Sequence, residues 1–129
     1  MTARGKTGRH ARTDWRVVAR LDRCTLLEVA LHTGRTHQIR AHFAAIGRPV
    51  LGDTLYGAPR DLRVGTRNLP RLERNFLHAA RIGFSHPSSG AWVEVRAPLP
   101  NDLRVYFEQI AENLGLQKTE IDSALAPYL

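Results

Sequence analysis

Apolar residues change their spacing along this chain, and each change marks a predicted element. Trp15, Val17 and Ala19 are apolar at every second position, which is typical of a β-strand with one buried face. A polar turn at 21–23 separates this run from the β-rich, mostly apolar run 24–31. The two runs predict a β-hairpin.

After the second run the period changes from two residues to 3.6. Ile39, Phe43 and Ile46 fall at positions i, i+4 and i+7, with alanines between them, which predicts an amphipathic helix over about 37–46. Thr36 stands where it can cap the first turn of this helix. A glycine after Ile46 can end the helix in the left-handed conformation.

The second half of the chain predicts a loop, a hairpin and a helix. Residues 58–75 hold two prolines, one glycine and five arginines, and we expect a long loop there. Residues 76–84 and 91–97 predict a second hairpin with a polar turn between its strands. Pro98 and Pro100 then stop the strand, and a helix follows to about residue 114, with the asparagine after Pro100 as its cap.

These elements predict one α+β domain with a mainly antiparallel mixed sheet, a motif helix at about 37–46 and a C-terminal helix at about 101–114. Residues 1–12 have no apolar periodicity, and we expect a basic flexible arm. Residues 13–114 form the predicted domain. Residues 115–129 predict a weak tail with some helical character at 120–125.

Charge is unevenly distributed along the 129 residues. The formal net charge is +7, from 19 basic and 12 acidic residues. Residues 1–23 and 60–82 are basic, whereas 83–129 carry more acidic than basic side chains. A positive field of this kind favours a polyanion such as RNA, although a solvated arginine-rich surface explains the total equally well.

Cysteine and histidine usage argues against a metal site. Cys24 is the single cysteine, which excludes an internal disulfide and suits a reducing compartment. His37 and His42 are five residues apart, so they do not share a helix face as the i, i+4 ligands of a zinc protease do. No apolar run approaches the roughly 18 residues that span a bilayer. We expect a cytoplasmic protein without metal or membrane contact.

Polar residues capable of chemistry concentrate where the second predicted strand gives way to the helix. The segment 31–42 reads Leu-His-Thr-Gly-Arg-Thr-His-Gln-Ile-Arg-Ala-His, and it combines a strand end, a glycine turn at Gly34 and a helix start. Arg35, Arg40 and the neighbouring histidines converge near a helix N-terminus, where anions are favoured. For Asp53 we weigh catalysis against a turn aspartate that bonds its own backbone, and for Tyr56 stacking on a base against packing over the turn.

This segment resembles the RluA-type pseudouridine synthases. The likeness rests on 33–42 (Thr-Gly-Arg-Thr-His-Gln-Ile-Arg-Ala-His), on 46–53 (Ile-Gly-Arg-Pro-Val-Leu-Gly-Asp) and on Tyr56-Gly57. Shorter matches occur at Ala11 to Trp15, Leu77-His78-Ala79, His86-Pro87 and Ala97 to Pro100. The resemblance covers roughly residues 8–112, and its long motif is specific.

The resemblance implies an enzyme that detaches uracil at its glycosidic bond, turns the base and rejoins it through carbon 5, with no cofactor and no metal. It implies a catalytic aspartate in a His-Arg-Leu-Asp motif upstream of the residues present here. Arg40 matches the family arginine that pairs with that aspartate. The implied RNA contacts are Arg35, His37, Gln38 and His42. The implied structural residues are Gly34, Gly52, Asp53 and Tyr56, with Asp53 holding the loop after the helix.

The segment around Asp22 superficially resembles the motif that carries the catalytic aspartate in this family. Asp22 follows Arg20-Leu21, but the preceding histidine and the following Ser-Gly of the family motif are absent. It also stands eleven residues before Thr33, in the predicted hairpin turn. We therefore exclude Asp22 as the nucleophile.

The prediction for function is the C-terminal part of a pseudouridine synthase catalytic domain, whose parent isomerises uridine in RNA, with ribosomal RNA the first expectation. Because the catalytic aspartate lies upstream, we expect the isolated chain to be inactive. The alternative is a non-catalytic basic RNA-binding module on the same scaffold. A surface left open by the missing half would also allow self-association.

Overall fold

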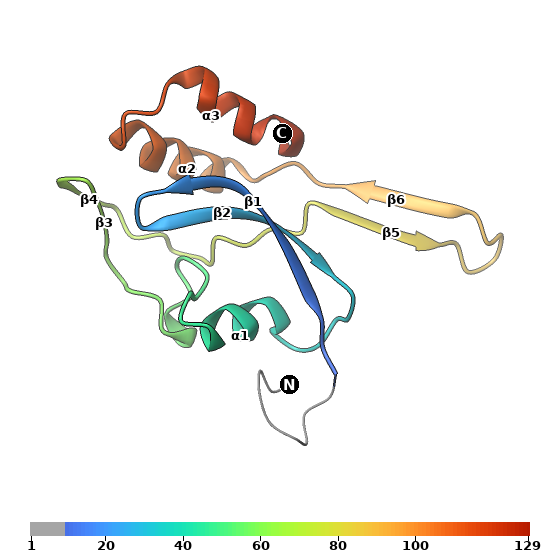
Figure 1. Cartoon of the computed structure of the whole chain (residues 1–129). Coiled ribbons are helices and arrows are strands. Elements are labelled where there is room, and N and C mark those ends of the chain that lie inside the picture. The colour runs from blue at the N-terminus through green and yellow to red at the C-terminus, as the bar shows by residue number, and fades with distance from the viewer. Residues whose placement is uncertain (1–9) are drawn as a thin grey trace.

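The computed structural model describes residues 10–129, and it has the expected α+β class (Figure 1). Most of the predicted basic arm therefore lies outside the described residues. Among residues 10–129 the strands form three separate two-stranded antiparallel sheets rather than one mixed sheet. No helix within this range is long and apolar enough to cross a membrane.

The first hairpin matches its prediction closely. Strand β1 covers Thr13–Leu21 and β2 covers Cys24–Leu31, paired from Thr13 with Leu31 at one end to Leu21 with Cys24 at the other. The predicted buried face is only partly correct, because a register shift between Val17 and Ala19 breaks the alternation. Trp15 stays 54% exposed, whereas Leu21 is buried in the core.

Helix α1 spans Gln38–Ala45, one residue shorter at each end than predicted. It packs against β1, where the rings of Trp15 and Phe43 meet edge to face with centroids 5.4 Å apart. The predicted cap at Thr36 is wrong: His37 occupies the N-cap position, and it makes no side-chain capping bond. Hydrogen bonds of the Gln38 side chain hold the turn before the helix instead.

The predicted loop at 58–75 contains a very short hairpin, the second in chain order. Strand β3 covers Leu62–Val64 and β4 covers Arg67–Leu69, after a 3₁₀ turn η1 at Thr54–Tyr56. Leu62, Val64 and Leu69 are buried and belong to the main core. The loop prediction is wrong here because three-residue strands are too short for alternation to stand out among arginines.

The third sheet is the hairpin of β5, Arg81–Ser85, and β6, Trp92–Arg96. It extends away from the rest of the molecule (Figure 1). Ile82, Phe84 and Val95 are exposed although they are apolar. The observed strands are shorter than the predicted runs 76–84 and 91–97.

The core lies between the C-terminal helices and the first two hairpins. Helix α2 covers Asn101–Asn113 and buries Leu103, Phe107 and Ile110. Its N-cap position is Pro100, so the predicted Asn101 cap is wrong. The segment predicted as a tail is helix α3, Lys118–Leu125, followed by the 3₁₀ turn η2, Ala126–Tyr128. The tail prediction underestimates this segment, since two α3 side chains join the core cluster.

A contact near the C-terminus makes stability depend on pH. The hydroxyl of Tyr128 donates a hydrogen bond to Glu28 on β2, and Arg16 also contacts this carboxylate. These partners hold the pKa of Glu28 below its ordinary value of 4.5. A lowered carboxyl pKa stabilises the folded chain above the unfolded pKa, and this contribution disappears as the pH falls through the folded pKa.

Tyr128→Phe is therefore expected to lower the free energy of unfolding at pH 7 by less than about 1 kcal/mol, because the pair is exposed to solvent. The difference between the two proteins should shrink as the pH falls below 4.5. Urea unfolding at a series of pH values measures it. Asp14, whose pKa is lowered first by its hydrogen bond with Arg12 and then by His32, titrates in both proteins and cancels in the comparison. A difference that does not change with pH contradicts the prediction.

Candidate active-site segment

The side chain of Gln38, the first residue of α1, holds the turn between β2 and α1. Its side chain is 3% exposed, and its Oε1 accepts hydrogen bonds from the Thr33 hydroxyl at 2.7 Å and from the Arg35 backbone N–H at 3.0 Å. Its Nε2 donates to the Arg12 carbonyl and to the Thr13 hydroxyl, both at 2.9 Å. All four hydrogen-bonding positions of the amide are used, which leaves none for RNA in this conformation. Gln38 ties the turn to the start of β1.

His37 has the unusual backbone of this turn. Its φ of 50° and ψ of 32° lie in the left-handed region, which is uncommon for a residue other than glycine. The glycine of the motif, Gly34, has no positive φ, and a methyl group added to it would meet no atom within 4 Å. The sharp bend that the sequence places at Gly34 is therefore made at His37. The His37 ring points at Tyr56, with 3.1 Å between Nδ1 and the hydroxyl oxygen.

Arg40 and Asp53 form a two-point ion pair across the turn after α1. Nε of Arg40 donates to Oδ2 at 2.7 Å, and Nη2 donates to Oδ1 at 3.0 Å. The Asp53 side chain is 1% exposed and that of Arg40 is 16% exposed. The hydrogen bonds that Arg40 donates to Asp53 raise the pKa of Arg40 above its ordinary value. This parallel geometry is the strong form of an arginine–carboxylate contact.

The guanidinium of Arg40 keeps further bonding capacity. Two of its five N–H groups bind Asp53, which leaves three for another acceptor. Its Cζ lies 4.8 Å from the centre of the Tyr56 ring, so the aromatic face covers one side of the cation. The family resemblance implies that Arg40 is half of an ion pair whose aspartate lies upstream. In the structure Arg40 already has one carboxylate partner within the chain, Asp53. This ion pair holds the side chain of Arg40 in a fixed position.

The loop that carries Asp53 depends on Gly52. The φ of Gly52 is +83°, and a Cβ at this position would stand 2.2 Å from the backbone oxygen of Arg74. Only glycine fits both the conformation and the close approach. The Asp53 carbonyl in turn accepts hydrogen bonds from the backbone N–H groups of Tyr56 and Ala58, which close the loop.

The remaining predicted contact residues separate into an exposed one and a tethered one. The Arg35 side chain is exposed, has no carboxylate within 4.0 Å in the range 10–129, and contacts only the His10 carbonyl, at 3.4 Å. His42 lies on the side of α1 that faces β1, where its Nδ1 is 2.7 Å from the Thr13 hydroxyl. Since that hydroxyl oxygen already accepts a hydrogen bond from Gln38, its proton can go to His42.

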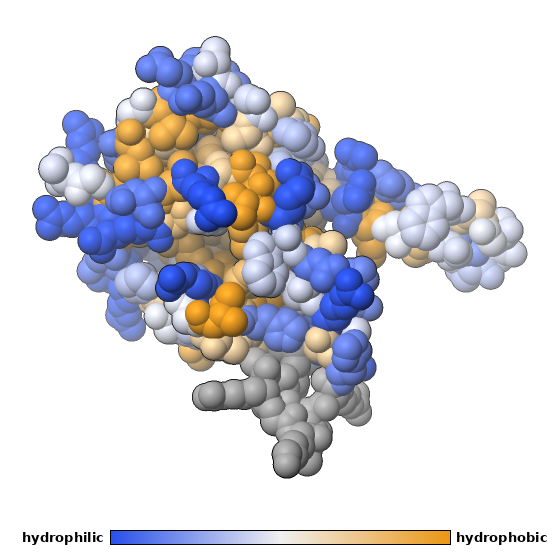
Figure 2. Space-filling view, in the orientation of Figure 1, coloured by the Kyte–Doolittle hydropathy of each residue, from blue (hydrophilic) through white to orange (hydrophobic). Residues whose placement is uncertain are grey.

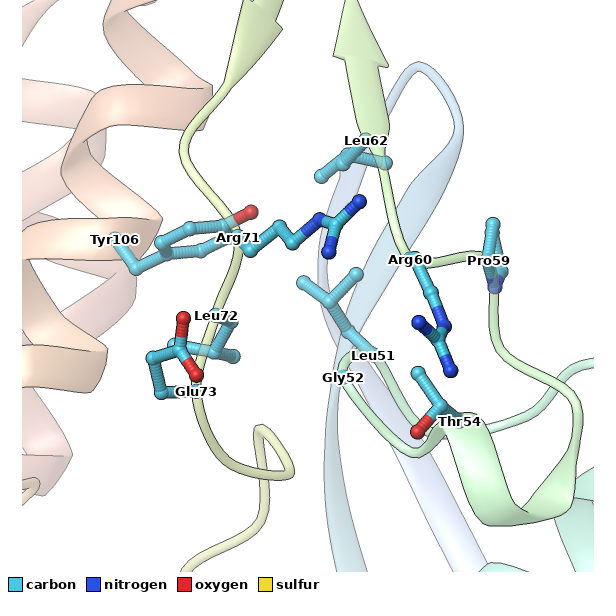
Figure 3. Close-up of a pocket in the computed structure, with 10 residues that line it drawn as sticks. All are labelled: Leu51, Gly52, Thr54, Pro59, Arg60, Leu62, Arg71, Leu72, Glu73 and Tyr106. Atoms are coloured by element: carbon cyan, nitrogen blue, oxygen red, sulfur yellow. The ribbon is translucent and has the colours of Figure 1, made fainter.

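A small pocket of about 230 Å³ lies beside the loop that carries Asp53 (Figure 3). Gly52 and Thr54, the neighbours of Asp53, form part of its wall. Arg60 and Arg71 project into it from the following segment (Figure 3). Within residues 10–129, no group of three or more His, Cys, Asp or Glu side chains is placed to hold a metal ion.

The sequence of this chain is similar to those of known proteins. Residues 1–45, which include the turn and all of α1, match the family model described as RNA pseudouridylate synthase. An RNA pseudouridine synthase of Chloroflexus aurantiacus, described as uncharacterized, is 48% identical to this chain over 105 residues, or 81% of the chain. The chain belongs to the RluA family of RNA pseudouridine synthases.

Two relatives in this family have a more specific name. Proteins named ribosomal large subunit pseudouridine synthase D, from Vibrio cholerae and Zymomonas mobilis, are 40% and 38% identical to the chain over 118 and 103 residues. The matches cover 88% and 80% of this chain but 36% and 32% of those relatives. The chain thus spans about a third of the length of the pseudouridine synthases that it matches.

The structure separates Asp22 from the site of this pseudouridine synthase segment. Asp22 lies in the turn that joins β1 to β2, whereas the motif begins at the opposite end of β2. Seven residue steps at about 3.3 Å each place the two ends roughly 23 Å apart. This separation supports the exclusion of Asp22 as the nucleophile.

Sequence reasoning missed two features of the site. The first is the contact of Thr13 with both Gln38 and His42, which joins residues more than 20 positions apart. The second is the pairing of Arg40 with Asp53, although both residues had been singled out. The signal that could have identified the pair is that two oppositely charged residues stand in neighbouring stretches of the family motif.

Proposed function

We propose that this chain contributes the arginine side of the active site of an RNA pseudouridine synthase that acts on ribosomal RNA. The reaction breaks the bond between ribose C1′ and uracil N1, forms a bond between C1′ and C5, and moves the C5 proton to N1. Atoms therefore balance without a cofactor. The names of the two relatives from Vibrio cholerae and Zymomonas mobilis support ribosomal RNA as the substrate class.

The observation that carries the proposal is the fixed position of Arg40. Asp53 holds two of its N–H groups, and the ring of Tyr56 covers one face, so the remaining donors have a defined direction. A catalytic carboxylate beside a flipped base needs such a partner to stay ionised. We infer that the upstream aspartate of the family binds these remaining donors. Because the chain supplies no such aspartate, it is inactive alone.

A segment exchange tests the proposal. The 118-residue span of the Vibrio cholerae relative that matches this chain is replaced by the corresponding residues of this chain. Pseudouridine in ribosomal RNA, measured by mass spectrometry, is expected with the exchanged protein, at least tenfold less with the same protein carrying Arg40→Met, and none with the isolated chain. Turnover by the isolated chain, or full activity of the Arg40→Met protein, contradicts the proposal.

A non-catalytic RNA-binding module is the second candidate. Arg35 of the motif favours it, because its side chain is exposed and has no carboxylate within 4.0 Å among residues 10–129. In that case the exchanged protein forms no pseudouridine although the isolated chain still binds RNA.

A cytoplasmic location is part of the proposal in either form. Self-association is part of it too, since the apolar residues Ile82 and Phe84 of the β5–β6 hairpin are exposed. Sedimentation at several concentrations measures it.

A further inference from the structure

Four exposed arginines lie at the tips of two hairpins. Arg20 lies near the end of β1 and Arg23 lies in the turn between β1 and β2. Arg63 and Arg67 lie on β3 and β4. We call them the hairpin-tip arginines. Within the described range, none of the four has a carboxylate oxygen within 4.0 Å. The other charged residue of these tips is Asp22, so three net positive charges remain.

Shared packing holds the two tips at the same end of the molecule. Leu21, next to the first turn, belongs to the same buried cluster as Val64 and Leu69 of the second hairpin. Cys24 packs against this cluster, which also contains Tyr106. Figure 1 shows both turns on the left side of the body, and Figure 2 shows hydrophilic side chains gathered there.

Most arginines elsewhere in the fold have acidic partners. In the part of the chain that the structure describes, seven arginines have a carboxylate oxygen within 4.0 Å, among them Arg74 with Asp102 and Arg104 with Glu108. The hairpin-tip arginines thus differ from most of the surface, where positive charge is locally neutralised. Unpaired guanidinium groups retain their full capacity for bidentate contacts with phosphate.

We propose that the hairpin-tip arginines bind the phosphate backbone of the RNA at a distance from the reacting uridine. This inference rests on the proposed function, because it takes the partner to be RNA. The tips lie at the end of β1–β2 opposite the motif, roughly 23 Å away from it along β2. At about 3.4 Å per nucleotide along one strand, an RNA that touches both places extends over some seven nucleotides.

A salt titration of RNA binding tests the inference. The probe is a fluorescein-labelled RNA stem-loop with a 20-base-pair stem, and the readout is anisotropy with the complete 129-residue chain. Replacing Arg20, Arg63 and Arg67 together by glutamine is expected to lower affinity at least tenfold at low salt. The slope of log K against log salt is expected to fall in magnitude by about 2, since each lost phosphate contact contributes about 0.7–0.9.

The matched control replaces Arg74, Arg96 and Arg104 together by glutamine. It removes the same amount of positive charge, but from arginines that form ion pairs. It is expected to change affinity less than twofold. Equal losses in both triple variants, no loss in either, or no binding by the unmodified chain overturns the inference. Circular dichroism confirms folding, and the double variant Arg63→Gln/Arg67→Gln, both on exposed positions, replaces the triple variant if that one unfolds.

This test and the segment exchange fail separately. The hairpin-tip variant can bind RNA more weakly than the control variant although the exchanged protein forms no pseudouridine. That result contradicts the proposed function and supports RNA binding by the hairpin-tip arginines. Pseudouridine formed by the exchanged protein, with equal binding of both triple variants, supports the function and overturns the surface.

Discussion

Asp53→Ala is expected to lower the free energy of unfolding of this chain by about 3 kcal/mol, as measured by urea unfolding. Asp53 is 1% exposed and accepts both hydrogen bonds from Arg40, so the substitution removes a buried charge pair and leaves its cation without a partner. Breaking a buried pair on one side is among the more destabilising single changes.

The control is an arginine–aspartate pair of the same chemistry on the surface. Arg71 donates through Nε to Asp61, but both side chains are more than half exposed. Asp61→Ala is therefore expected to change the free energy of unfolding by less than about 1 kcal/mol. Equal effects of the two alanine substitutions would show that burial of Asp53 does not determine the strength of its pair.

A double-mutant cycle separates the pair from the individual side chains. Arg40→Met alone also destabilises the chain, because it leaves the buried Asp53 carboxylate unpaired. The double variant Arg40→Met/Asp53→Ala is expected to lose less than the sum of the two single losses. Additive losses contradict the interpretation of Arg40 and Asp53 as one unit.

Gln38→Ala is expected to lower the free energy of unfolding by about 2–3 kcal/mol, because buried donors and acceptors lose their partners. The substitution removes four hydrogen bonds at once from the turn between β2 and α1. It also removes the link between Thr13 at the start of β1 and Thr33 near the beginning of the turn. Thermal and urea unfolding measure the loss.

Gln109→Ala on helix α2 is the control for this substitution. Gln109 is exposed, and alanine is at least as good a helix former, so a change within about 0.5 kcal/mol is expected. A loss below 1 kcal/mol for Gln38→Ala would mean that water replaces the amide in the turn. That outcome contradicts the role of Gln38 as the clamp of the turn.

Local periodicity was sufficient to predict the longer elements. The first hairpin, helix α1 and helix α2 appear within a few residues of their predicted bounds, because each shows its period over eight residues or more. The hairpin of β3 and β4 was missed since each strand has three residues. Helix α3 was underestimated because its burial depends on α2, which lies beside it only in the folded chain.

The site could be predicted as a set of residues but not as a set of contacts. The family resemblance singled out Gln38, Arg40, Asp53 and Tyr56 together. It did not show that Arg40 binds Asp53, or that Gln38 uses all its hydrogen-bonding positions within the turn. Nor could composition place the left-handed conformation at His37, where tertiary contacts determine the backbone.

The projecting hairpin of β5 and β6 divides the chain into units of different cooperativity. Nine of its ten strand residues are exposed, so separating the two strands uncovers little apolar surface. A two-stranded hairpin without further packing is marginally stable in water. Its backbone amides should therefore exchange with solvent deuterium through local opening, while amides of α2 exchange only when the core unfolds. A surface that covers Ile82 and Phe84 would bring both regions into one exchange regime.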